Sequence, residues 1–187
     1  GEVVDAVQFA LENPDAPVEA YLDFIQGPDF PTGGFIVGRR GAQDALLTGR
    51  GSVKVRGVTE IEELPRGKTA IIVRELPYMV SQDRLLEKIA SLVNEKKIAG
   101  ISDLRNESSS RTGTRLVIEL RRDAVPQVVL NQLHKMTQLQ DSFGVNNVAL
   151  VDGVPRTLNV AEMIGHYIDH QMEVIERRTQ FRLQKAK

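Results

Sequence analysis

Cysteine is absent from this chain of 187 residues, which excludes disulfide bonds, thiolate zinc sites and cysteine nucleophiles. Tryptophan is absent as well, and histidine occurs only at His134, His166 and His170. Few residues are therefore available for catalysis by histidine. No apolar run approaches the ~20 residues that a bilayer-spanning helix requires. We therefore expect a soluble, cytoplasmic protein without a membrane partner.

The chain does contain enough apolar sequence to form a core, since 41% of its residues are hydrophobic and 26% are charged. That balance is typical of a globular domain and not of a disordered tail. The formal net charge is −1, so a nucleic-acid role has to come from a local basic patch. Helical apolar patterns reach both Gly1 and Lys187, whereas domain boundaries usually lie in polar linkers. We expect a piece of a longer polypeptide.

Charge is segregated along the sequence. Residues 1–32 hold seven acidic side chains and no basic one, whereas residues 33–58, called the basic segment below, hold a single acid, Asp44. The basic segment contains five basic residues, namely Arg39, Arg40, Arg50, Lys54 and Arg56. Cations among glycines can approach a phosphate backbone closely, which makes these five the DNA-contact candidates. The competing interpretation is a solvated strand face.

Hydrophobic periodicity predicts an irregular alternation of helices and strands. We expect helices over residues 2–12, 18–25, 42–47, 125–136 and 159–187, with a further helix capped by Ser81. We expect strands over 35–37 (buried), 52–63, 69–76, 114–120, 145–151 and 154–158, with hairpin turns at Arg66-Gly67 and Asp152-Gly153. This order favours an α+β fold over a doubly wound parallel sheet: a mostly antiparallel sheet layered with helices, followed by a long C-terminal helix.

Two short motifs resemble nucleotide or metal sites, and their context argues against both. Gly67-Lys68-Thr69 matches the end of a phosphate-binding loop, but Glu62 stands where that loop needs glycine, and a strand follows. His166 and His170 are four residues apart on one expected helix, but Tyr167 replaces the glutamate of zinc peptidases, and a third ligand is missing. The sequence nominates no catalytic residue and no metal site.

Several longer segments, in matching order and spacing, resemble the A-subunit family of bacterial DNA gyrase, a type IIA topoisomerase. They are Gly27-Pro28-Asp29-Phe30-Pro31-Thr32, Gly38-Arg39-Arg40-Gly41, Thr48-Gly49-Arg50-Gly51, Glu75-Leu76-Pro77-Tyr78, Arg122-Asp123-Ala124, residues 137–144 (Thr-Gln-Leu-Gln-Asp-Ser-Phe-Gly) and Arg177-Arg178-Thr179. The resemblance covers nearly the whole chain. It implies that residues 1–158 form the tower-like domain and that residues 159–187 begin the long coiled-coil helix.

The resemblance also implies a role. In the family, the tower supports the bent arms of the DNA segment that the enzyme cleaves during ATP-dependent negative supercoiling. The family's nucleophilic tyrosine follows an arginine in a winged-helix domain, whereas Tyr21, Tyr78 and Tyr167 follow other residues here. We therefore expect this chain alone to be inactive and to hold no cofactor. In the parent enzyme, magnesium and ATP enter through the B subunit, which joins a homodimer of A subunits in the A2B2 holoenzyme.

Two alternatives remain open at this point. The A subunit of topoisomerase IV, a decatenating enzyme, shares much of the same pattern, although residues 137–144 look more like gyrase. The chain could instead be a purely structural or protein-interaction module, in which the acidic helices and the C-terminal helix bind partners. The C-terminal helix supports this alternative, because Tyr167, Val174 and Phe181 recur every seven residues.

Overall fold

The structure is a computed structural model that describes residues 1–186. Its elements are α1 (Glu2–Glu12), the 3-10 helix η1 (Val18–Asp23), β1 (Phe35–Ile36), α2 (Arg40–Thr48), β2 (Arg50–Arg56), β3 (Val58–Leu64), β4 (Lys68–Glu75), α3 (Gln82–Asn94), β5 (Ile101–Asn106), β6 (Leu116–Leu120), α4 (Pro126–Met136), β7 (Gln140–Asn146), β8 (Val148–Val151), β9 (Val154–Thr157) and α5 (Val160–Ala186). The resolved strand registers are antiparallel. The expected α+β class with a long C-terminal helix is confirmed.

The chain folds into two compact units that alternate along the sequence. Unit 1 comprises Gly1–Pro28, Arg39–Ser52 and the chain from Gly144 onward, and unit 2 comprises Asp29–Gly38 and Val53–Phe143. Strands β2 and β7 each contain residues of both units. Within residues 1–186, no helix is long and apolar enough to cross a membrane.

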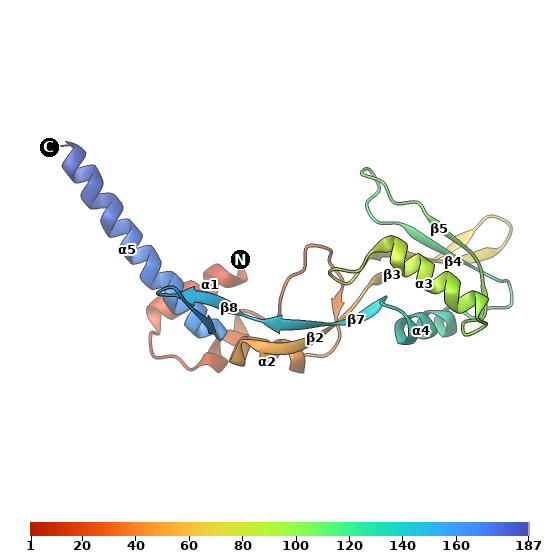
Figure 1. Cartoon of the computed structure of the whole chain (residues 1–187), viewed down its shortest axis with the longest axis horizontal. Helices are drawn as coiled ribbons and strands as arrows, with labels where there is room; N and C mark the ends of the chain where they lie inside the picture. The colour runs from red at the N-terminus through yellow and green to blue at the C-terminus, as the bar shows by residue number, and fades with distance from the viewer. Residues whose placement is uncertain (187) are drawn as a thin grey trace. The chain divides into compact units, whose positions relative to one another are not determined.

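Unit 2 is built on a four-stranded sheet of order β3-β4-β6-β5. Helices α3 and α4 cover one face of this sheet (Figure 1), and their apolar stripes pack on side chains such as Ile71 and Ile118. Ile89 of α3 and Leu133 of α4 are fully buried there. Each such side chain contributes about 1.5–3 kcal/mol by leaving water. This two-layer core leaves the other face of the sheet without a covering helix.

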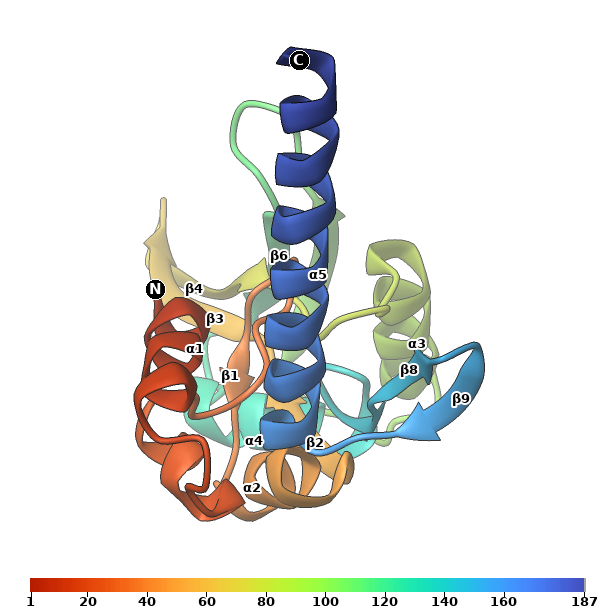
Figure 2. The ribbon, with the colours of Figure 1, turned by 90° about the vertical axis from the view of Figure 1, so that its left-hand side faces the viewer.

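Unit 1 packs short helices around the start of α5. Ala6, Tyr21, Ile164 and their neighbours form its core, and α1 and α2 lie beside the first turns of α5 (Figure 2). Helix α5 begins with a reciprocal capping box, as the sequence predicted. Asn159 N–H donates to Glu162 Oε2 (2.9 Å), and Glu162 N–H donates to Asn159 Oδ1 (2.8 Å). Beyond its first turns, α5 exposes apolar side chains, including Tyr167, Ile175 and Phe181.

Several expected elements differ from those observed. The single strand expected over 52–63 is two strands, β2 and β3, which belong to different sheets and meet at Gly57. A Cβ at Gly57 would stand 2.7 Å from the Glu75 carbonyl oxygen, so the close approach of the backbone there requires glycine. The strand at 35–37 is exposed and not buried. Strands β5 and β7 were not expected, and the expected helix at 18–25 is the 3-10 helix η1.

Candidate nucleic-acid interface

The first two candidate cations stand where α2 begins. Arg39 is the N-cap residue of α2, Arg40 is its first residue, and both side chains are exposed. The helix ends at Gly49 in the left-handed conformation (φ 77°), and the chain turns back into β2. Gly51 then lies directly on α2, since a Cβ there would stand 2.7 Å from the Ala45 backbone nitrogen. Helix α2 and the start of β2, which carries the exposed Arg50, are therefore held tightly together.

Alternation along β2 gives this strand a basic face. Val53 and Val55 are buried, at 1% and 2% exposure, so the alternate residues Arg50, Lys54 and Arg56 point to the opposite face. Side chains two residues apart on a strand are about 6.8 Å apart. Lys54 and Arg56 are thus close enough together on one face of the strand to contact the same phosphate backbone.

Gln140 of β7 holds Arg56 in position. Its Oε1 accepts hydrogen bonds from Arg56 Nε (3.0 Å) and Nη2 (2.6 Å). A neutral amide orients the guanidinium without cancelling its charge, and the remaining N–H groups of the fork stay available for an anion. Gln140 thus orients a candidate cation, and sequence reasoning missed this contact.

Within residues 1–186, no carboxylate forms an ion pair with any of the five candidate cations. Their charge is therefore not neutralised by an ion pair within the described part of the chain. The five are divided between the units, with Arg39, Arg40 and Arg50 in unit 1 and Lys54 and Arg56 in unit 2.

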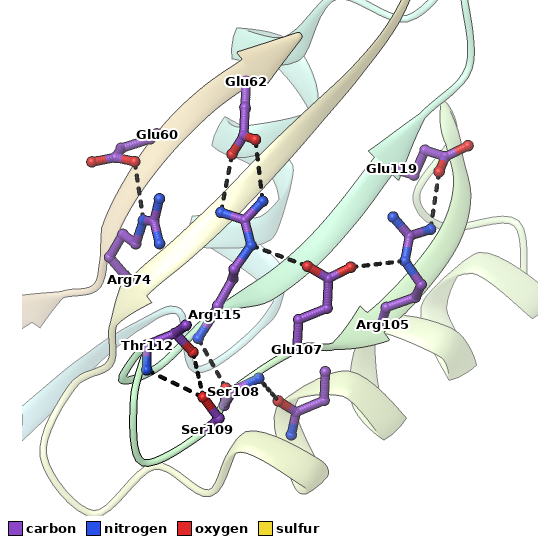
Figure 3. Close-up of polar contacts among 11 residues, drawn as sticks. Glu60, Glu62, Arg74, Arg105, Glu107, Ser108, Ser109, Thr112, Arg115 and Glu119 are labelled. Atoms are coloured by element: carbon purple, nitrogen blue, oxygen red, sulfur yellow. Dashed lines mark hydrogen bonds and ion pairs between the residues drawn. The ribbon is translucent and has the colours of Figure 1, made fainter. Parts of the chain in front are cut away.

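The outer face of the four-stranded sheet, called the ion-pair face below, is organised in the opposite way (Figure 3). Arg115 donates to both carboxylate oxygens of Glu62 (3.0 and 3.1 Å) and to Glu107 (3.0 Å). Glu107 also accepts from Arg105 (3.3 Å), which in turn donates to Glu119 (3.0 Å). The whole face carries five acids and four bases, namely Glu60, Glu62, Asp103, Glu107, Glu119, Lys68, Arg74, Arg105 and Arg115.

The charged side chains of the ion-pair face cover a small hydrophobic cluster. It consists of Ala70, Ile72 and Val117, each exposed by 1% or less. Hydrogen bonds, chiefly from Lys68 and then from Arg105, hold the pKa of Glu119 below its ordinary value, and the hydrogen bond from Arg115 does the same for the pKa of Glu62. An ion pair carries no net charge, so cations paired in this way attract a phosphate only weakly. The structure therefore separates a neutralised face on the sheet from unpaired cations on α2 and β2.

The histidines lie on two helices, with His134 on α4 and His166 and His170 on α5. Burial, and then the positive charge of Arg56, lowers the pKa of His134, which favours its neutral form. His166 and His170 are exposed on α5, and no group of three His, Cys, Asp or Glu side chains in residues 1–186 could hold a metal. Tyr21 is buried, and Tyr78 stacks with Phe30.

Comparisons with known proteins cover the whole chain. The family described as the A subunit of DNA gyrase/topoisomerase IV matches residues 1–187. A DNA gyrase A subunit of Mycolicibacterium smegmatis (strain ATCC 700084 / mc(2)155) is 53% identical over 190 residues, covering 100% of this chain and 23% of that protein. The DNA gyrase A subunit of Streptomyces coelicolor is 54% identical over 189 residues, covering 99% of this chain and 22% of that protein.

A third relative is similar at nearly the same level. The DNA gyrase A subunit of Staphylococcus epidermidis is 50% identical over 186 residues, covering 100% of this chain and 21% of that protein. The chain thus spans about a fifth of the length of these relatives. The expected resemblance is confirmed, and the chain belongs to the A-subunit family of DNA gyrase and topoisomerase IV.

Proposed function

We propose that this chain is the tower region of the A subunit of a DNA gyrase and that it supports the bent arms of the DNA segment to be cleaved. The observation that carries the proposal is the set of cations on α2 and β2, exposed except for the half-buried Arg56, without a carboxylate partner in the described chain. The contrast with the ion-pair face supports it, because the same chain neutralises the basic side chains that lie on the sheet. A surface that binds phosphates needs unpaired charge.

Under this proposal, the parent protein is an ATP-dependent, cytoplasmic type IIA topoisomerase that introduces negative supercoils. Its A subunit forms a homodimer and joins the B subunit, through which magnesium and ATP act. Residues 1–158 are the tower-like domain, and residues 159–187 begin a coiled coil. The names of the relatives favour gyrase over topoisomerase IV, since those compared above are gyrase subunits.

The proposal assigns no chemical step to this chain. In the family the nucleophilic tyrosine follows an arginine, whereas Tyr21, Tyr78 and Tyr167 follow Ala20, Pro77 and His166. We expect the purified chain to leave supercoiled DNA intact, with or without magnesium and ATP. Gel analysis after protease treatment tests this, and a covalent protein–DNA adduct would contradict it.

Duplex binding at a series of salt concentrations tests the DNA-supporting role. Each phosphate contact adds about 0.9 to the slope of log affinity against log salt, so replacing Arg39, Arg40 and Arg50 with alanine should flatten the slope by close to three units. All three side chains are exposed, and such substitutions change stability by about 0.5 kcal/mol or less each.

A matched triple variant controls for the loss of net charge. Arg66, Arg84 and Arg111 are exposed and have no ion-pair partner in the described chain, and they lie outside the basic segment. Arg105 is unsuitable, because it lies on β5 and its removal would deprive Glu119 of a partner. Equal weakening by both triple variants, with parallel slopes, would refute the assignment of the basic segment to DNA.

A protein-interaction module is the second candidate, and the exposed apolar side chains of α5 favour it, Tyr167, Ile175 and Phe181 among them. The two candidates predict different salt behaviour. An apolar interface is nearly insensitive to salt, whereas phosphate contacts give a steep slope.

A further inference from the structure

The short strand β1 carries an apolar strip at the edge of the three-stranded sheet of order β1-β2-β7. Phe35 is 60% exposed, and its neighbours Ile36 and Val37 are each 37% exposed. Exposed edge strands usually carry charges or proline, which prevent pairing with other chains. Three consecutive exposed apolar residues on such an edge are a liability unless they have a function.

Phe35 also differs from the other phenylalanines of unit 2. Phe30 and Phe143 pack edge-to-face at 5.1 Å between ring centres, and both contact Tyr78. The ring of Phe35 has no aromatic partner in the described chain. A ring this exposed contributes little to the stability of unit 2, so stability does not explain its presence.

The neighbours of this strip are cations. Phe35 stands directly opposite Arg56 in the antiparallel pair of β1 and β2, and Val37 N–H donates to the Lys54 carbonyl oxygen (2.8 Å). Directly opposite residues project to the same face of a sheet, with Cβ atoms about 4.5–5.5 Å apart. Phe35 therefore shares a face with Arg56, and by alternation with Lys54. One small surface combines an apolar ring with two positive charges.

We propose that Phe35 enters the minor groove of duplex DNA and contacts its sugar edges while Lys54 and Arg56 contact the bordering phosphates. The inference rests on the proposed function and adds the groove and the apolar contact to it. The minor groove is about 6 Å wide and too narrow for a helix, and proteins that bind it pair cations with apolar side chains such as phenylalanine. The paired strands β1 and β2 present both kinds of side chain next to each other, the ring on the edge strand and the cations on its neighbour.

Charge complementarity selects a duplex over other occupants. Lys54 and Arg56 have no carboxylate partner in the described chain, so this surface suits an occupant that carries negative charge. A single strand would need a series of stacking aromatic side chains, and Phe35 is the only aromatic residue in the segment.

The test compares two exposed phenylalanines in the 187-residue chain by fluorescence anisotropy with a short A·T-rich duplex. Phe35→Ala is the probe, and Phe181→Ala, which truncates a 64% exposed ring on α5, is the matched control. Burying the remaining surface of one such ring corresponds to about a five- to twentyfold change in affinity. We expect Phe35→Ala to weaken binding by that factor at every salt concentration with the same salt slope, and Phe181→Ala to bind like the wild type.

Netropsin, a small molecule that occupies the minor groove of A·T-rich DNA, provides the second measurement. It should weaken the wild type more than Phe35→Ala, because the variant has already lost the groove contact. Wild-type binding with a steep slope, together with unchanged binding by Phe35→Ala or equal sensitivity of both proteins to netropsin, would overturn the minor-groove inference and leave the proposed function standing. A flat slope or no binding by the wild type would refute the proposed function, and the inference with it.

Discussion

Replacing Gly49 with alanine should destabilise unit 1 and loosen the turn between α2 and β2, called the α2–β2 junction below. The candidate residues Arg40 and Arg50 lie on the two elements that this turn connects. Gly49 combines two constraints, since its φ is 77° and its Cβ would overlap the carbonyl of Leu158, with the carbonyl carbon 2.9 Å away. The backbone around it is held in place as well. Asn147 N–H donates to the Gly49 carbonyl oxygen (2.8 Å), and Leu158 N–H donates to the Asn147 carbonyl oxygen (2.9 Å).

The two constraints can be assigned separate free energies. A left-handed conformation costs a non-glycine residue about 1–2 kcal/mol, and forcing an extra methyl group into packed surroundings costs about 1–3 kcal/mol. Gly49→Ala should therefore lower the free energy of unfolding by about 2–5 kcal/mol. Gly153 has the same φ of 77° but no atom within 4 Å of its Cβ position. Gly153→Ala should cost only the conformational part, about 1–2 kcal/mol.

Urea unfolding followed by far-ultraviolet circular dichroism measures both variants. With a slope of about 2 kcal/mol per molar urea, the midpoint of Gly49→Ala should fall about 1 M or more below that of the wild type. Gly144→Ala is the neutral control, since Gly144 has neither a positive φ nor a close neighbour. If Gly49→Ala lost no more stability than Gly153→Ala, the backbone at Leu158 would move aside without cost. The inference that the α2–β2 junction is rigid would then be wrong.

Two further predictions concern the ion-pair face and α5. Because the folded-state pKa values of Glu62, Glu107 and Glu119 are lowered, their stabilisation is present above the unfolded pKa of about 4.3 and is lost as the pH falls through the folded values. Urea midpoints measured from neutral pH to about pH 3 should therefore decline less steeply in Glu119→Gln than in the wild type, and parallel declines would argue against the ion pairs. In α5, amide hydrogen exchange should be fast beyond about residue 172 in a proven monomer, because a helix end without tertiary contacts is marginal in water. Strong protection as far as Arg182 would contradict this.

The sequence predicted the elements whose patterns are local. The Asn159 capping box, the Arg66-Gly67 hairpin turn and helix α4 each depend on residues close together in the chain. The sequence did not predict strand β5, because a register shift between Ile101 and Asp103 disrupts the alternation of side chains. It did not predict strand β7, because most residues of that strand are polar. The three apolar residues of 35–37 suggested burial, but they lie on an edge strand.

The candidate site was predictable only as far as charge clustering allowed. Composition identified the five cations of the basic segment. Sequence could not pair Arg56 with Gln140, which is 84 residues away, or Arg115 with Glu62, which is 53 residues away, because these contacts arise from sheet pairing. The cations that stay unpaired can therefore be told from those that are neutralised only once the fold is known.

The alternation of the two units along the chain has a consequence for cleavage of the backbone. The backbone passes from one unit to the other after Pro28, Gly38, Ser52 and Phe143. Four covalent crossings therefore join the units, where a single linker would give one. No single proteolytic cut can release one unit from the other. Limited proteolysis would have to cut all four crossings before the two units came apart.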